Sequence, residues 1–217
     1  MSAEIFPRIG LLILFVAILV SISNIGIIIA CWLGAVKVDA ITIFYGKPVF
    51  TFKTRFGPVL IGYIPAGGYV KIDMEEFPKK SRIIRCLVNL AGSVSIFITS
   101  LICLGFSHAT ASFVSTYLQF AGIIFSPLSY GKGLVGAYLA HAQTAPVAGY
   151  GILAAKTAAL NLLPLPSLPG GRLLIEQVEK RDESRLAKFL NALGSLVAVG
   201  ILISMAVLIF SYFFGHR

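Results

Sequence analysis

Asn161-Leu162-Leu163-Pro164-Leu165-Pro166-Ser167-Leu168-Pro169-Gly170-Gly171-Arg172 places three prolines and two glycines inside an otherwise apolar part of the chain. Proline removes a backbone donor and clashes with the preceding helical turn. At membrane depth, such irregular backbone is tolerated only where it is buried in protein or lines a wet cavity. The stretch therefore predicts that other parts of the chain surround it.

The composition is that of an integral membrane protein. The 217 residues are 57% hydrophobic and 12% charged, with a mean hydropathy of +0.90, which is far too apolar for an average soluble domain. The net charge of +9 comes from cations clustered beside apolar runs, without a basic stripe of interleaved aromatics, so nucleic-acid binding is not expected. Cys31, Cys86 and Cys103 form no C-x-x-C pair and are interpreted as small buried hydrophobes.

The alternation of apolar and mixed segments predicts one membrane domain over residues 1–217. We expect an all-α polytopic membrane protein of about four transmembrane helices with a small membrane-associated β-sheet. The spans are predicted at about 9–36, 83–106, 147–163 and 192–214, the β-rich loop at 37–82, a segment along the outer interface at 107–146 and a mixed-charge helix at 173–191. Within the β-rich loop, residues 48–56 alternate as in a half-buried strand, with Phe50, Phe52, Thr54 and Phe56 on one side, and a turn is expected from Pro65 to Gly68. A further short span within 107–146 stays an alternative.

Charge asymmetry predicts the topology. Nine cations lie between Lys37 and Arg85 and five between Arg172 and Lys188, whereas the loop between the second and third spans has Lys132 alone. The positive-inside rule then makes the first and third loops cytoplasmic and both termini external. A bacterial inner membrane is the expected location.

Several motifs resemble those of the site-2 protease family, the M50 intramembrane zinc metalloproteases. The stretch from Asn161 to Arg172 resembles N-x-x-P-x-P-x-L-D-G-G, and Gly62 to Val70 resembles the G-Y-x-P-x-G-G-Y-V of that family's re-entrant sheet. Ala91-Gly92-Ser93 matches A-G-P in part, and Ser126 to Ser129 resembles G-P-x-S. The resemblance covers nearly the whole chain and implies the family's membrane core.

The resemblance also implies where a zinc site would lie. In the family, zinc is held by the two His of H-E-x-x-H and the Asp of L-D-G-G, with the Glu as general base. Spacing from the first strand places Ser23, Asn24 and Ile27 on the H-E-x-x-H positions, and Pro169 on the Asp position. No catalytic residue, metal site or cofactor is therefore expected, and a pseudoprotease, not an enzyme, is predicted.

The function expected from this pattern is non-proteolytic binding in a groove that once held substrate. The partner would be a transmembrane or extended segment of a membrane protein, with the chain acting as a complex subunit or as a regulatory or protective factor, surrounded by membrane lipid. The alternatives are an active metalloprotease with a non-standard site and a small pore or transporter around Lys156. The groove residues are predicted to be Ser23, Asn24, Gly67, Gly68, Tyr69, Lys156, Asn161, Pro164, Pro166 and Pro169.

Each groove residue also has a plainer interpretation. Lys156 either faces a cavity at bilayer depth or snorkels to an interface. Ser23 and Asn24 either bond to the broken backbone around Pro164 to Pro169 or satisfy only local backbone. The segment Gly62 to Lys71 either accepts a client strand at its edge or is a structural hairpin.

Overall fold

The computed structural model of the chain describes residues 5–165 and 168–178, together with Ala192, Gly194, Val207 and Tyr212. These residues form two compact units, one from Phe6 to Ile98 and one that begins at Thr99. The predicted span at 192–214, most of the expected helix at 173–191 and Pro166 lie outside the described residues. The single domain expected over residues 1–217 stays a prediction.

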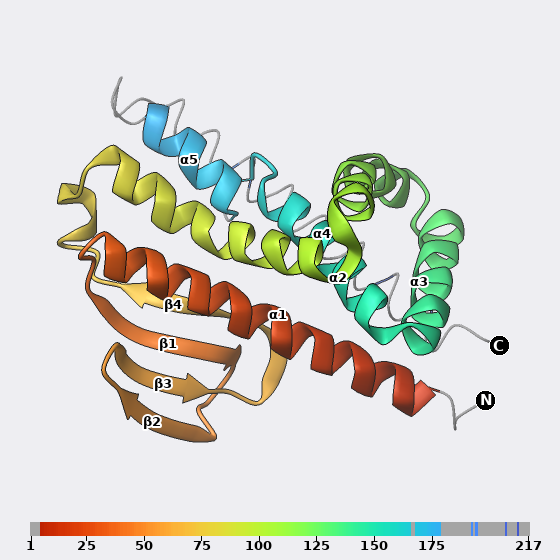
Figure 1. Ribbon diagram of the computed structural model, residues 1–217, viewed down its shortest axis with the longest axis horizontal. Coiled ribbons are helices and arrows are strands. Elements are labelled where there is room, and N and C mark those ends of the chain that lie inside the picture. Colours follow the sequence, from red (N-terminus) through yellow and green to blue (C-terminus); the bar gives the residue numbers. More distant parts are fainter. Residues whose placement is uncertain are drawn as a thin grey trace. The chain divides into compact units, whose positions relative to one another are not determined.

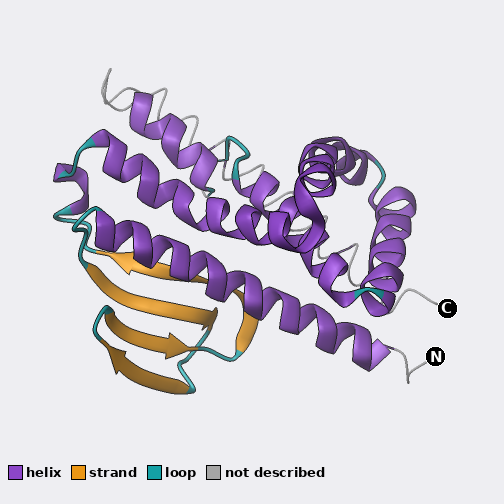
Figure 2. Ribbon diagram, viewed as in Figure 1, coloured by secondary structure: helices purple, strands orange, loops and turns teal. Residues whose placement is uncertain are grey.

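The first unit combines one long helix, a small sheet and the start of a second helix (Figure 1). Its elements are α1 (Ile5–Leu33), β1 (Val38–Tyr45), β2 (Phe50–Thr54), β3 (Gly57–Ile61), β4 (Ile64–Ile72), a short 3-10 turn (Phe77–Lys79) and the first part of α2 (Arg82–Phe125). The second unit contains the rest of α2, a π-helical turn (Pro127–Gly131), α3 (Lys132–Thr144), α4 (Pro146–Asn161) and α5 (Pro169–Val178). Helix is the main secondary structure, as Figure 2 shows.

The strand order is β2-β3-β1-β4, with β1 parallel to β3 and antiparallel to β4. The alternation over 48–56 is confirmed as a strand, although β2 is shorter, because the chain turns after Thr54 and returns as β3. The turn expected at Pro65 to Gly68 is instead part of β4. Pro65 is tolerated there because β4 is an edge strand, and Gly68 fits because a Cβ would lie 2.4 Å from the Thr42 carbonyl oxygen.

Small residues bring α1 and α2 together. A Cβ on Gly26 would lie 2.0 Å from Ser95 Oγ, and one on Gly92 would lie 2.5 Å from Ser23 Oγ. Such small-residue contacts are how helices pack when lipid removes most of the hydrophobic driving force. At the loop end of the helices, a buried cluster of Cys31, Val36, Phe77 and Val88 joins both helices to the sheet connection. Large apolar side chains remain exposed on both helices, which suits contact with lipid chains.

Among the described residues, two helices are long and apolar enough to cross a membrane, Phe6–Leu33 and Arg82–Phe125. Within the second, the backbone at Gly105 is not helical (φ 74°, ψ 167°), so the predicted span end at 106 coincides with a break between two helical segments, and the second segment continues to Phe125. Only glycine adopts this backbone conformation readily. The segment predicted to lie along the interface, 107–146, is thus mostly helical, in α2 and α3.

Small residues also pack the second unit. Ala154, Ala155, Ala158 and Ala159 make one side of α4 almost completely buried. A Cβ on Gly151 would lie 2.8 Å from Cys103 Cβ of α2, and Tyr117 donates a 3.2 Å hydrogen bond to the Ala159 carbonyl. These contacts hold α4 close to α2. Lys156 lies in this part of α4, one helical turn before Leu160.

Candidate functional site

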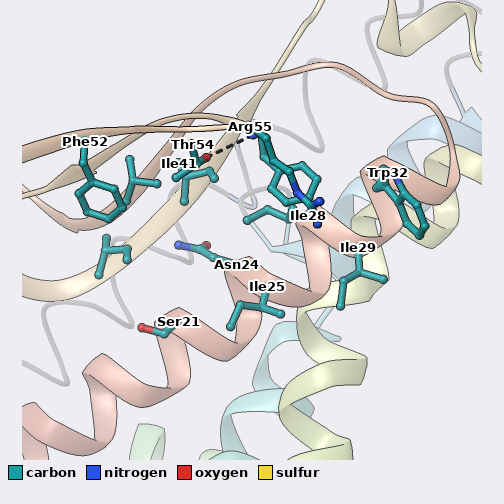
Figure 3. A pocket seen from close by; sticks show the side chains of 13 residues that line it. Ser21, Asn24, Ile25, Ile28, Ile29, Trp32, Ile41, Phe52, Thr54 and Arg55 are labelled. Carbon is teal, nitrogen blue, oxygen red and sulfur yellow. Dashed lines mark hydrogen bonds between the residues drawn. The ribbon is translucent and has the colours of Figure 1, made fainter.

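A cavity of about 600 Å³ lies between α1 and one face of the sheet (Figure 3). At β4 the helix is close, since a Cβ on Gly68 would lie 2.6 Å from Val20 Cγ1. Over β1, β3 and β2 it leaves the space open. The cavity is lined by Ser21, Asn24, Ile25, Ile28, Ile29, Trp32, Ile41, Ile43, Phe52, Thr54, Arg55, Phe56 and Val59. Its volume lies within the range of small-ligand sites, and its wall is mainly aliphatic and aromatic.

Asn24 is the polar side chain that connects the two walls of this cavity. It is 4% exposed, and its Nδ2 donates a 3.1 Å hydrogen bond to the carbonyl oxygen of Thr42 in β1. Its partner is therefore the sheet, which neither interpretation from the sequence included. The buried Thr42 Oγ1 has no hydrogen-bond partner among the described residues. Asn24 thus fixes the position of α1 on β1 and presents one amide to the cavity.

Ser23 and Ile27 lie on a different face of α1. Both face Gly92 of α2, where an added Cβ would be 2.5 Å from Ser23 Oγ and 3.3 Å from Ile27 Cδ1. Residues i and i+4 share a helix face, so the two positions of the family's paired histidines point together, as the resemblance implies. In this chain that face packs against α2. Ser23 is absent from the cavity lining, and the structure separates it from Asn24.

The glycine-rich strand β4 forms one edge of the sheet. Gly67 has a φ of 143°, and Tyr69 stacks on Tyr45 with ring centroids 6.2 Å apart. The opposite edge is β2, whose five residues are all exposed and which contributes Phe52 and Thr54 to the cavity. Among the described strands, each edge has a partner on one side only. Sequence reasoning chose the β4 edge, whereas the cavity opens beside β2.

The proline-rich stretch is a tight helix-to-helix connection. Helix α4 ends at Asn161, Pro164 is exposed, and α5 begins at Pro169. Proline suits a first helical position because its missing N–H is not needed there. Gly170 is required, since a Cβ would lie 2.3 Å from the Leu162 carbonyl oxygen. The Leu168 amide bonds to the Leu165 carbonyl at 2.8 Å, so the broken backbone satisfies part of its own hydrogen bonding.

Lys156 is half-buried in α4, and its Nζ donates to Gln119 Oε1 of α2. It lines a second cavity, built from α2, α3 and α4, together with Tyr138 and His141. The interpretation of Lys156 as facing a cavity therefore fits its surroundings. Its predicted role in a client groove stays a prediction.

The loop after β4 carries the clearest electrostatic effects. Asp73 accepts hydrogen bonds from the amides of Glu75 (3.0 Å) and Glu76 (3.3 Å), which lower the pKa of its carboxyl group, with a smaller effect from Lys37. Lys79 donates a 2.8 Å hydrogen bond to Glu76, which raises the pKa of the Lys79 ammonium. Lys80 donates to the Ala35 carbonyl at 2.6 Å, just beyond the C-terminus of α1. Cations are favourable at that end of a helix.

The two long apolar helices and the small sheet are typical of a helical membrane protein, and a cavity lies between α1 and the sheet. A family model described as Peptidase family M50 matches residues 11–206, which is most of the chain. The chain therefore belongs to Peptidase family M50, a family of membrane-embedded peptidases. The comparison with curated proteins produced no match.

Family membership corrects one expectation from the sequence. The prediction that the chain is not an enzyme is wrong, because the match identifies a peptidase domain over residues 11–206. The differences at the motif positions show which metal-binding side chains are replaced, and they do not by themselves exclude peptidase activity. The resemblance to the site-2 protease family is confirmed.

The zinc that the family implies does not fit the residues at the expected positions. Ser23 faces Gly92, Ile27 has no donor atom, and the Pro169 side chain has none either. Zinc is bound in proteins by cysteine, histidine or carboxylate side chains. In the described part of the chain, no three His, Cys, Asp or Glu side chains gather. No step of hydrolysis is assigned to these residues.

Sequence reasoning missed most of the cavity wall. Trp32, Phe52 and Arg55 were not among the predicted groove residues, although the alternation of Phe50, Phe52 and Thr54 placed Phe52 on one face of a strand. The signal that identifies Phe52 is its position on an edge strand under α1, which requires the strand order. Arg55 lies with its guanidinium carbon 4.6 Å from the centroid of the Phe56 ring, a cation–π geometry at the rim.

Proposed function

We propose that this M50 family membrane protein binds a transmembrane or extended segment of a client protein in the cleft between α1 and the sheet. The observation that carries the proposal is the cavity of about 600 Å³, whose apolar wall includes Trp32 and Phe52 and whose polar groups include the buried amide of Asn24. Extended segments bind sheets by adding a strand at an exposed edge. Strand β2 is exposed along its whole length and borders the cavity, so it is the edge to which the client is assigned.

The β2 edge is favoured over the β4 edge on hydrogen-bonding grounds. Pro65 in β4 has no amide hydrogen to offer, and Gly67 has a positive φ that interrupts an extended ladder. Strand β2 contains neither residue type. A client strand on β2 would alternate its side chains between the cavity and the opposite face. Gly67, Gly68 and Tyr69 then act through β4 as support for β1, under α1.

A defined probe tests client binding. The full chain is reconstituted in nanodiscs with a synthetic peptide of about 20 apolar residues followed by an alternating extended segment, and p-benzoylphenylalanine replaces Phe52. The matched control places it at Leu118, an apolar residue of α2 that is more exposed than Phe52 and absent from the cavity lining. We expect adducts at Phe52 that Ile28→Trp reduces by filling the cavity. Equal adduct yields at both positions would overturn the assignment.

Cleavage of the bound segment is the second candidate, and family membership favours it. The same peptide, incubated with the reconstituted chain and analysed by mass spectrometry, would reveal products with one consistent cut. Metal content of the purified chain and sensitivity to a chelator are measured in parallel. Products that Ile28→Trp abolishes would assign cleavage to this cleft. Products unaffected by Ile28→Trp would assign it elsewhere.

We also propose the membrane arrangement inferred from the charges: four spans, the basic loops cytoplasmic, both termini external and the bacterial inner membrane as location. The described part of the chain supports the first two spans with helices of sufficient length. Cysteine labelling tests the rest, with Lys53→Cys in the first loop and Lys132→Cys in the second. Lys53→Cys is expected to react in inverted membrane vesicles and Lys132→Cys in intact cells. The reverse pattern would contradict this topology.

A further inference from the structure

A cavity of about 400 Å³ within the second unit lies between α2, α3 and α4. Its wall is mainly apolar, with Phe120 and Ile123 from α2, Leu134 from α3 and Ile152 from α4. Lys156, which is half-buried, is the one Lys or Arg among the residues that line it, and it contacts Gln119 of α2. An apolar cavity with one cationic group is suited to an amphipathic anion.

Among the residues that the structure describes, no carboxylate pairs with the charge of Lys156. Its described partner is the neutral amide of Gln119. The sequence contains no Asp or Glu from Phe77 to Ile175, a segment that includes every residue lining the cavity. Even a half-buried ammonium without an anion is costly, and charged groups at membrane depth usually have a partner. The anion that completes this site is therefore expected to come from a ligand.

The available donors indicate a small anionic head. Tyr138 already donates its hydroxyl hydrogen to the Gly149 carbonyl, and Thr116 donates its own to the Ser112 carbonyl. The Lys156 ammonium has further hydrogens, and the Gln119 amide nitrogen is not used in the bond through Gln119 Oε1, so both can bind the ligand. His141 and Thr157 also line the cavity. Two adjacent donor groups match the two oxygens of one carboxylate.

We propose that this cavity binds a single-chain amphipathic carboxylate of the fatty-acid class. The carboxylate would accept hydrogen bonds from Lys156 Nζ and Gln119 Nε2, and the hydrocarbon chain would lie against Phe120, Leu134 and Ile152. The cavity volume is near the lower end of the range for ligand sites, which favours one chain over a two-chain phospholipid. No residue that lines this cavity lines the proposed client cleft, so its test does not depend on client binding or cleavage.

The test uses the full chain in nanodiscs of neutral lipid and a photoactivatable palmitate carrying a diazirine on its chain. Labelling is quantified by mass spectrometry and competed with palmitate, methyl palmitate or phosphatidylglycerol. Palmitate is expected to compete and methyl palmitate to compete at least tenfold less well, because the ester lacks the charge. Equal competition by both, or stronger competition by phosphatidylglycerol, would overturn the proposal.

Variants identify the cation involved. Lys156→Gln is expected to weaken palmitate binding by about tenfold or more, the scale of a charged hydrogen bond, and Lys156→Arg to retain most of it. Lys132→Gln removes the same charge from α3 outside the cavity and should leave binding unchanged. Gln119→Leu provides a second variant if Lys156→Gln fails to fold. Unchanged palmitate binding in Gln119→Leu and in any folded Lys156→Gln protein would refute the site. An equal loss of binding in Lys132→Gln would also refute it, because the effect would then be a general electrostatic attraction and not binding in the cavity.

Discussion

Gly26 on α1 marks the closest approach of the two long helices in the first unit, and its replacement tests that packing. A Cβ there would lie 2.0 Å from Ser95 Oγ, 2.7 Å from Ser95 Cβ and 2.8 Å from the Ala91 carbonyl oxygen. The Ser95 hydroxyl can rotate away, whereas a backbone oxygen moves only if the helix moves. Gly26→Ala is therefore expected to push α1 and α2 apart.

The magnitude follows from two opposing effects. Overpacking costs about 1–3 kcal/mol, and Gly→Ala within a helix returns up to about 1 kcal/mol of propensity. Gly10→Ala is the matched control, because Gly10 lies on the same helix with nothing within 4 Å of its added Cβ. The difference in the free energy of unfolding between the two variants isolates the contact and should be about 1–3 kcal/mol.

The assay is reversible unfolding of the full chain in mixed micelles by increasing the fraction of denaturing detergent, followed by circular dichroism. Ser95→Gly combined with Gly26→Ala should recover part of the loss, since it removes two of the three close contacts and leaves the one to Ala91. The coupling in this double-mutant cycle is expected to be stabilising. If Gly26→Ala and Gly10→Ala unfold within about 0.5 kcal/mol of each other, the close packing of α1 on α2 is refuted.

Three further predictions concern other contacts. Asn24→Leu removes the donor to the Thr42 carbonyl and should lower the free energy of unfolding by about 1–3 kcal/mol. Asn24→Gln should recover part of this loss. Equal stability of Asn24→Leu and the parent chain would contradict this role of Asn24. Gly170→Ala places a Cβ 2.3 Å from the Leu162 carbonyl oxygen, so α5 should become more accessible to protease, whereas Gly133→Ala, with open space around it, should not change the cleavage pattern. Because the pKa of Asp73 is lowered in the folded chain, its carboxylate stabilises the folded loop above the unfolded pKa of about 4, and this contribution is lost as the pH falls through the lower folded pKa. Hydrogen exchange of the Glu75 and Glu76 amides should therefore accelerate as the pH falls through that window. If Asp73→Asn shows the same acid response as the parent chain, Asp73 is not the cause.

Much of the fold could be predicted because the signals were local. The first long apolar helix, the alternating strand at Phe50–Thr54 and the break after Asn161 each follow from a pattern within a few turns of chain. The helical segment after Gly105 was not predicted, because Gly105 breaks the helix and a second helical segment follows it directly. Interruptions in an apolar sequence do not distinguish a kink from a loop.

The candidate site was predicted only in part, because side-chain direction depends on partners distant in sequence. Ser23 and Asn24 are adjacent, yet one faces Gly92 of α2 and the other bonds to Thr42 of β1. Phe52 joins the cavity because β2 pairs with β3, and β3 lies parallel to β1. The β1–β3 pairing joins strands that are not consecutive in the chain, and no local sequence pattern predicts it.

The sequence by itself determined the membrane character, the family and the residues at the family's motif positions, since hydropathy and motif spacing are properties of the chain alone. The tertiary structure decided which of those residues share a surface. It directed Asn24 to the cavity between α1 and the sheet, packed Ser23 and Ile27 against α2, and placed Lys156 beside Gln119 at a mainly apolar cavity. These outcomes depend on the strand order and on the close approach of helices at small residues, which arise from long-range packing.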